Sequence, residues 1–138
     1  MRVVAQRVSQ ASVEVGGRTA GRIGPGLLLL VGIERGDGER ETAFLADKAL
    51  HLRIFPDPQG RMNLDVQQAG GEILSVSQFT LAARNRKGRR PDFANAEEPG
   101  RARELYDRFN ALLRRTVPVA EGQFGAMMDV RSVNSGPV

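Results

Sequence analysis

Uncharged polar side chains form the first group in this sequence whose types and spacing suit chemistry. The segment Ser77-Gln78-Phe79-Thr80 places two hydroxyls and one amide near the end of a predicted strand. Such groups donate and accept hydrogen bonds without carrying charge, so they suit a neutral binding pocket. Taken alone, the segment is more typical of a polar strand end than of a catalytic site.

A second unusual segment closes the chain as Asn134-Ser135-Gly136-Pro137-Val138. Glycine lets the backbone approach another group closely, and the bond before a proline is the usual place for a cis peptide. Only about 5–6% of X–Pro bonds in folded proteins are cis. Gly136-Pro137 alone therefore indicates an ordinary terminal turn as readily as a functional loop.

Conventional acid–base and metal chemistry has few candidate residues here. The chain has no cysteine and one histidine, His51, which lies beside Leu50 and Leu52 in a predicted amphipathic helix and is interpreted as structural. This excludes thiolate chemistry and disfavours zinc sites and a Ser-His-Asp triad. We find no phosphate-binding or dinucleotide-binding glycine motif. We expect no metal and no cofactor, and an enzyme built this way would work through positioning and oriented backbone donors.

Basic residues outnumber acidic ones, 20 to 16, giving a net charge of +4 over 138 residues. This balance is compatible with RNA binding and equally with a basic surface that has no such role. Five cations fall within seven residues: Arg84, Arg86, Lys87, Arg89 and Arg90. Arg7 lies in an apolar strand, where an unpaired charge is costly to bury. We see no signal peptide, and the apolar run 27–31 is too short to span a membrane, so we expect a cytoplasmic protein.

The elements that position these residues begin with strands. Alternation over 11–15 predicts a half-buried strand, and Gly16-Gly17 predicts a tight hairpin into a second strand over 18–23. Gly24-Pro25-Gly26 predicts another turn. The continuous apolar run 27–33 predicts a strand covered on both faces.

Two helices and further strands follow. Asp37 is the expected cap of a first helix that carries Leu45, Ala49 and Leu52 on one face and ends before Pro56 and Pro58. Strands are expected at 62–66 and 72–81. One apolar stripe predicts the second helix: Ala102, Leu105, Tyr106, Phe109, Leu112 and Leu113. Pro118 stops it, and alternation over 124–130 predicts a last strand.

This order of elements lacks regular strand–helix–strand alternation. It predicts one domain over 1–138, an α+β fold with a mostly antiparallel sheet closed toward a barrel and two main helices.

The Ser77–Thr80 segment and the Asn134–Val138 ending, at this separation in a chain this short, resemble the paired signatures of the D-aminoacyl-tRNA deacylase family. The resemblance covers the whole chain and includes Gln6-Arg7-Val8, Arg53-Ile54-Phe55 and Arg90-Pro91-Asp92-Phe93. Members of that family usually continue several residues past Gly-Pro-Val, and this sequence departs from them there.

The resemblance implies a homodimer that hydrolyses the ester of D-aminoacyl-tRNA and glycyl-tRNA and spares L forms. Ser77, Gln78, Phe79 and Thr80 would line each site. Gly136 and Pro137 would enter from the other subunit with a cis bond, and Arg7 would hold the partner's Gly-Pro carbonyl. The N–H groups of Phe79 and Thr80 would stabilise the oxyanion, and the basic residues of 84–90 would contact acceptor-stem phosphates.

Three alternatives stay open. The attacking step can use Thr80 as a nucleophile, for which no base is evident, or assistance from the ribose 2′-hydroxyl of the tRNA. A related deacylase that removes small L-amino acids, with the Gly-Pro bond in trans, has similar segments. A non-enzymatic RNA-binding module is the third reading, disfavoured because Tyr106 is the single tyrosine and tryptophan is absent, so stacking platforms are scarce.

Overall fold

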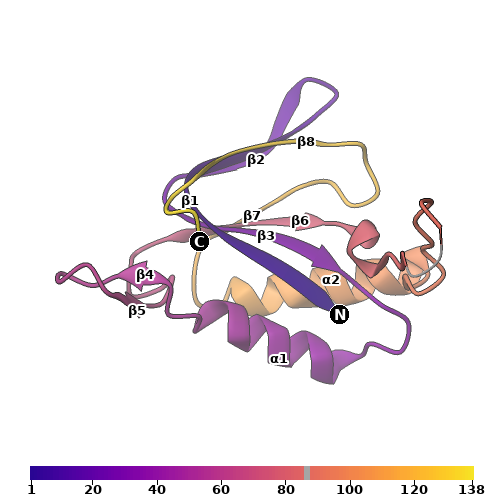
Figure 1. The fold of residues 1–138 in the computed structure, drawn as a ribbon, viewed down its shortest axis with the longest axis horizontal. Coiled ribbons are helices and arrows are strands. Elements are labelled where there is room, and N and C mark those ends of the chain that lie inside the picture. Colours follow the sequence, from indigo (N-terminus) through magenta and orange to yellow (C-terminus); the bar gives the residue numbers. More distant parts are fainter. Residues whose placement is uncertain (86–87) are drawn as a thin grey trace.

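A long N-terminal strand organises the sheet. The computed structural model describes residues 1–85 and 88–138. In it β1 (Arg2–Val15) pairs antiparallel with β2 (Arg18–Ile23) and then with β3 (Gly26–Gly32) (Figure 1). β8 (Asp129–Asn134) pairs with the same stretch of β1 that holds β2, and therefore lies along its opposite edge. The predicted strand over 11–15 is thus the last third of a longer one.

The strand β3 divides the interior into two cores. Leu27, Leu29 and Val31 pack toward the helices, while Leu28 faces a second cluster inside the curved sheet. This confirms the expectation that the run 27–33 is covered on both faces, as a continuous apolar strand requires.

The sheet is mixed and curls toward closure. β6 (Glu72–Ser77) runs parallel to β3, and β7 (Val119–Glu121) runs parallel to β6, giving the order β2-β1-β3-β6-β7. The two ends of this order approach one another, because a Cβ on Gly21 of β2 would lie 2.7 Å from the carbonyl oxygen of Glu121 on β7. The predicted α+β fold with a nearly closed barrel is confirmed, with two parallel pairs among antiparallel ones.

Two helices cover one face of the sheet (Figure 1). The helix α2 (Pro99–Leu113) buries the predicted stripe almost entirely, and Leu112 is its one partly buried member. The helix α1 (Glu39–Leu50) buries Ala46, Ala49 and Leu50 instead of the predicted Leu45 and Leu52. A small hairpin of β4 (Phe55–Pro56) and β5 (Met62–Leu64) projects beside α1.

Three boundaries differ from the sequence-based expectation. The N-cap of α1 is Gly38, not Asp37, because the Asp37 carboxylate accepts hydrogen bonds from the Glu34 N–H (2.6 Å) and the Met1 ammonium (2.5 Å). β6 ends at Ser77, four residues early, where the 3₁₀ turn η1 (Phe79–Ala82) begins after Gln78.

The predicted strand over 124–130 is wrong over most of its length. Residues 124–128 form a loop, and the strand β8 starts at Asp129. The alternating side chains of this segment do not face a sheet. Phe124 instead packs against Tyr106, with ring centroids 5.8 Å apart.

No helix among the described residues has the length and apolar character needed to cross a bilayer.

We predict that Gly26→Ala lowers the free energy of unfolding by about 1–3 kcal/mol or more, through overpacking. A Cβ at Gly26 would lie 1.9 Å from the carbonyl oxygen of Glu72, so β3 and β6 would have to separate. The matched control is Gly24→Ala, whose Cβ meets its nearest neighbour at 3.7 Å. Urea denaturation measures both, and equal losses in the two variants would contradict the argument.

Candidate active site

A cavity of about 670 Å³ opens beside η1 and includes all four residues of the predicted pocket segment: Ser77, Gln78, Phe79 and Thr80. The helix α2 contributes Ala102 and Tyr106, and the loop 124–128 forms another wall. A volume of this size suits a small-molecule group, and an apolar lining with a few polar groups is typical of such sites.

The end of β6 positions the segment. Ser77 pairs with Val31 of β3, and the Gln78 N–H donates to the Val31 carbonyl at 2.7 Å, after which the chain turns into η1. The N–H groups of Phe79 and Thr80 open this turn, and neither has an acceptor in the part of the chain that the structure describes. Two adjacent backbone donors are thus available beside the cavity.

The polar side chains of this segment interact with one another. The Gln78 amide donates to the Thr80 hydroxyl oxygen, which fixes both groups on the same side of the turn. The Phe79 side chain is 60% exposed, and its ring packs edge-on against Phe93 with centroids 5.2 Å apart.

Tyr106 is a site residue that sequence reasoning placed only in the apolar stripe of α2. Its ring lines the cavity, and its hydroxyl donates to the Ser75 carbonyl at 2.9 Å, two residues before Ser77. Burial raises the pKa of the Tyr106 hydroxyl, so the group stays a neutral donor. A tyrosine within an otherwise aliphatic and phenylalanine stripe was the available signal, because a buried phenol needs a hydrogen-bond partner.

The Gly136-Pro137 loop lies against Arg7. The peptide bond between these two residues is cis. Arg7 Nε donates to the Ser135 carbonyl at 2.8 Å, and the Arg7 N–H donates to the Val138 carbonyl at 2.9 Å. The guanidinium of Arg7 also donates to the Ile54 carbonyl, so this half-buried cation is well paired. Whereas the resemblance implied a contact with the partner's loop, Arg7 here holds the loop of its own chain.

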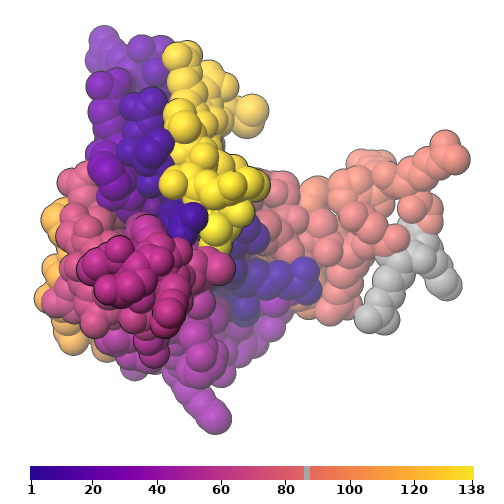
Figure 2. Space-filling model, turned by 60° about the vertical axis from the view of Figure 1, so that its left-hand side comes forward, coloured from indigo at the N-terminus to yellow at the C-terminus, as the bar shows by residue number. Residues whose placement is uncertain are grey.

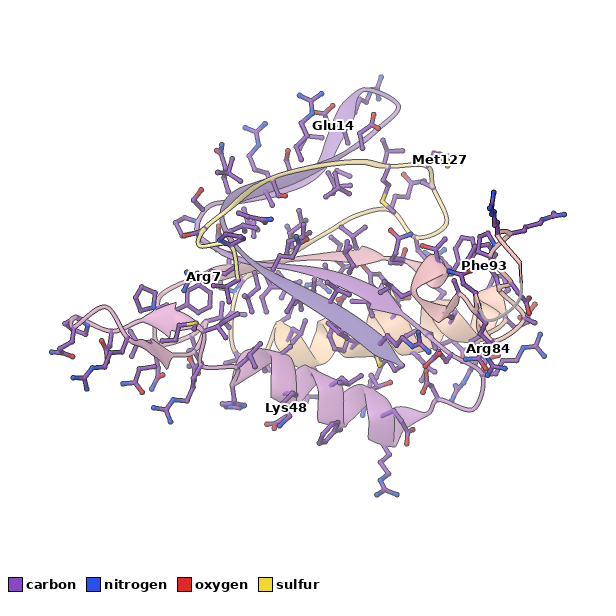
Figure 3. All side chains as sticks on the ribbon, viewed as in Figure 1. Arg7, Glu14, Lys48, Arg84, Phe93 and Met127 are labelled. Carbon is purple, nitrogen blue, oxygen red and sulfur yellow. The ribbon has the colours of Figure 1, made fainter. Side chains whose placement is uncertain are left out.

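The two predicted halves of the site do not meet within one chain. Arg7 pairs with Leu27 at the start of β3, whereas Ser77 pairs with Val31, four residues along, or about 13 Å. Gly136 and Pro137 do not line the cavity. Figure 3 shows the same separation, with Arg7 far from Phe93, which packs against Phe79.

The basic residues lie on a loop that projects from the body of the molecule (Figure 2). Arg84, Arg89 and Arg90 are exposed, while the predicted Arg86 and Lys87 lie outside the described residues. Arg84 donates to the Asn95 side chain at 2.7 Å, and its backbone pairs with Asp92. Arg84 therefore shapes the loop and remains accessible.

His51 takes no part in the cavity. It ends α1 as an exposed residue that contacts Asp47 one turn earlier, which agrees with its interpretation as structural. Across the described ranges 1–85 and 88–138, no group of three or more histidine or acidic side chains could hold a metal ion.

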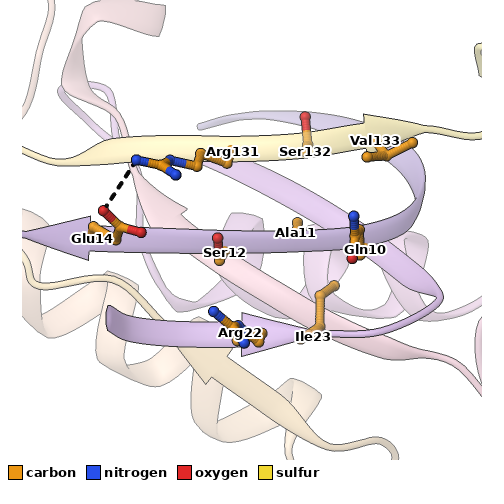
Figure 4. Close-up of a pocket in the computed structure, with 9 residues that line it drawn as sticks. All are labelled: Gln10, Ala11, Ser12, Glu14, Arg22, Ile23, Arg131, Ser132 and Val133. Carbon is orange, nitrogen blue, oxygen red and sulfur yellow. Dashed lines mark hydrogen bonds and ion pairs between the residues drawn. The ribbon is translucent and has the colours of Figure 1, made fainter. Parts of the chain in front are cut away.

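A second hollow of about 340 Å³ lies on β1, β2 and β8 (Figure 4). Its charged groups include Glu14 and Arg131, which form an ion pair at 3.5 Å. None of the predicted site residues lines it, so the cavity beside η1 is the stronger candidate for chemistry.

Comparison with known families and sequences gives a consistent result. A family model described as D-Tyr-tRNA(Tyr) deacylase matches residues 4–138. A D-aminoacyl-tRNA deacylase of Bacillus velezensis is 57% identical over all of this chain and 95% of its own length. One from Geobacter sulfurreducens is 55% identical over all of this chain and 91% of its length.

Solved structures agree in fold. A structure titled c-Myc DNA Unwinding Element Binding Protein is 41% identical, with a TM-score of 0.95, and covers 100% of this chain and 95% of that one. A structure of a probable eukaryotic D-amino acid tRNA deacylase is 21% identical with a TM-score of 0.80, covering 98% and 94%. At that identity the second likeness supports the fold alone.

We predict that Tyr106→Phe lowers the free energy of unfolding by about 0.5–1.5 kcal/mol, since it deletes the hydrogen bond to Ser75 and keeps the ring. The loss should fall at the lower end, because the Gly122 N–H also donates to the Ser75 carbonyl at 3.0 Å. Urea denaturation at neutral pH is the measurement. Tyr106→Leu, which also removes the ring, is the comparison and should cost more. A Phe variant as stable as the parent would show that this hydrogen bond contributes nothing.

Proposed function

This chain belongs to the D-Tyr-tRNA(Tyr) deacylase family, and we propose that it hydrolyses the ester between a D-amino acid and the terminal ribose of a tRNA. The carrying observation is full-length identity of 55–57% to D-aminoacyl-tRNA deacylases, joined to a cavity lined by Ser77 to Thr80. The products are free D-amino acid and uncharged tRNA. We place the reaction in the cytoplasm, where aminoacyl-tRNA is made and used.

In this reaction a water molecule adds to the ester carbonyl, the carbonyl oxygen gains negative charge, and the ribose oxygen leaves with a proton. The free N–H groups of Phe79 and Thr80 suit the role of oxyanion donors. They are part of the backbone, so they need no reorganisation as charge develops. Loss of one such donor typically costs about 2.7–4 kcal/mol of transition-state stabilisation.

The contacts of Thr80 favour assistance by the tRNA over a threonine nucleophile. The Thr80 hydroxyl oxygen already accepts from Gln78, and no histidine is among the described residues that line the cavity. An unactivated hydroxyl is a weak nucleophile. We therefore assign the orienting role to the free ribose 2′-hydroxyl, with Gln78 and Thr80 shaping the pocket around the ester.

Selection against L substrates requires a wall that the isolated chain lacks. Arg7 holds the Gly136-Pro137 loop at the far end of β3, and the loop is absent from the lining of its own cavity. We propose that the loop enters the cavity of a second copy in a two-fold dimer, which creates two equivalent sites. Backbone at this position would clash with an L side chain and leave room for a D side chain or for glycine.

The projecting basic loop is the proposed contact for the tRNA backbone. Arg84, Arg89 and Arg90 are exposed on the chain segment that follows η1. Phosphate contacts position a nucleic acid and read little of its sequence. The alternative is a nucleic-acid-binding module without catalysis, and the DNA-related title of the 41% identical structure speaks for testing it. A deacylase for small L-amino acids is distinguished by the same assay.

We predict that the purified protein hydrolyses D-tyrosyl-tRNA and glycyl-tRNA and leaves L-tyrosyl-tRNA intact. The D form and glycine place no side chain where the proposed loop would clash. Release of labelled amino acid is measured on the same tRNA in each case, with Thr80→Arg as the blocked-cavity control. Equal turnover of D- and L-tyrosyl-tRNA would remove the chirality argument, and hydrolysis restricted to L-alanyl-tRNA would favour the alternative deacylase.

We also predict that two inactive variants restore activity when combined. One carries Thr80→Arg and the other lacks the Gly136-Pro137 dipeptide, so their heterodimer keeps one site in which both elements are intact. Each subunit carries a different affinity tag, the heterodimer is isolated, and D-tyrosyl-tRNA hydrolysis is assayed. About half of the parental activity per dimer is expected. An inactive heterodimer that keeps the parental circular dichroism spectrum would show that each site is built within one chain.

A further inference from the structure

The cavity beside η1 is neutral apart from one side chain. Its polar lining consists of Ser77, Gln78 and Thr80, which carry no charge, and Glu97. Among the described residues that line the cavity, Glu97 is the single ionisable group that is charged at neutral pH. A carboxylate in a mostly apolar pocket is a strong determinant of which ligands fit, because it favours cations and disfavours anions.

Backbone contacts hold Glu97 at the wall of the cavity. Its N–H donates to the Ile33 carbonyl at 3.0 Å, which ties the segment before α2 to the end of β3, and Ile33 itself lines the cavity. The residue is half-buried. Glu97 therefore occupies a defined place, and its charge is partly shielded from bulk solvent.

The Glu97 carboxylate lacks a cation in the described part of the chain. Its Oε1 accepts a hydrogen bond from the Glu98 N–H at 2.8 Å, and no ion pair within 4.0 Å is found for it among residues 1–85 and 88–138. The nearby Glu34 is different, because it pairs with Arg2 at 3.0 Å and the Met1 ammonium at 3.5 Å. The second carboxylate oxygen of Glu97 is thus available to a ligand.

We propose that Glu97 selects substrates whose amino-acid side chain is cationic, so that D-lysyl and D-arginyl esters are preferred over neutral ones of the same shape. The inference rests on the proposed function. A lysine or arginine side chain lays its aliphatic stem on apolar surface and keeps its charge at the end. Here the stem would lie on Ile33 and neighbouring apolar wall, and the cationic end would meet Glu97.

The experiment compares two esters that differ only in charge. One tRNA is loaded with D-lysine or with D-norleucine, whose side chain has similar shape and no ammonium group. The parent is expected to show a higher kcat/KM for D-lysyl-tRNA, and Glu97→Gln should lower the lysine-to-norleucine ratio by roughly three- to tenfold, as for a partly exposed ion pair. Glu98→Gln is the matched control, because Glu98 is exposed and does not line the cavity, and it should leave the ratio at the parental value.

Binding gives a readout that does not depend on turnover. Adenosine carrying D-lysine or D-norleucine through a 3′-amide is titrated against the parent and both variants by calorimetry. A lysine preference that Glu97→Gln removes and Glu98→Gln keeps would establish the selection even if no ester were hydrolysed. In that case the proposed function would fail and the selection by Glu97 would stand.

Two results would overturn the inference while leaving the deacylase function intact. A lysine-to-norleucine ratio unchanged in Glu97→Gln would show that the carboxylate does not read the side chain. An equal fall in kcat/KM for both esters would place Glu97 against a group common to all substrates, such as the α-ammonium or the attacking water. Circular dichroism of each variant checks that the fold is kept.

Discussion

The parallel pairing of β3 with β6 is the constraint on which the rest of the structure depends. It begins where Gly26 lies against the backbone of Glu72 and ends where Val31 meets Ser77. Since β3 alternates between two cores, its register determines which side chains face the helices and which face the barrel. The same register determines the residue at which β6 stops. The polar segment Ser77 to Thr80 lies at the cavity because this ladder ends there.

The same strand separates the two functional segments. Arg7 and the Gly136-Pro137 loop are held at the start of β3, and the cavity opens at its end. A rigid sheet cannot bend so that these places meet, since each β3 residue is hydrogen-bonded to β1 and β6. If both segments act on one substrate, a second copy must supply one of them. This argument for a dimer comes from distance along a strand, and it is independent of any resemblance.

Local patterns in the sequence predicted the elements whose side chains serve packing alone. Gly16-Gly17 turns a hairpin with positive φ at both residues, and the stripe of α2 is buried as expected. The prediction failed where side chains serve the cavity. Phe124 and Met128 alternate like a strand but line the cavity from a loop, and Asp37 resembles a helix cap but binds the Met1 ammonium. Local spacing does not reveal such long-range partners, and for the same reason Glu97 and the hydrogen bond of Tyr106 were not foreseen.

Electrostatics gives the site its division of labour. Exposed cations project on the loop near η1, where screening by salt keeps them suited to weak, sequence-independent contact with phosphates. Within the cavity the ester meets uncharged hydroxyls, an amide and backbone N–H groups, which stabilise a developing oxyanion without binding the neutral ester tightly beforehand. A fixed cation there would attract phosphate oxygens into the place of the ester. Glu97 is compatible with this division, because a carboxylate at the wall repels phosphate while leaving the neutral donors free for the carbonyl oxygen.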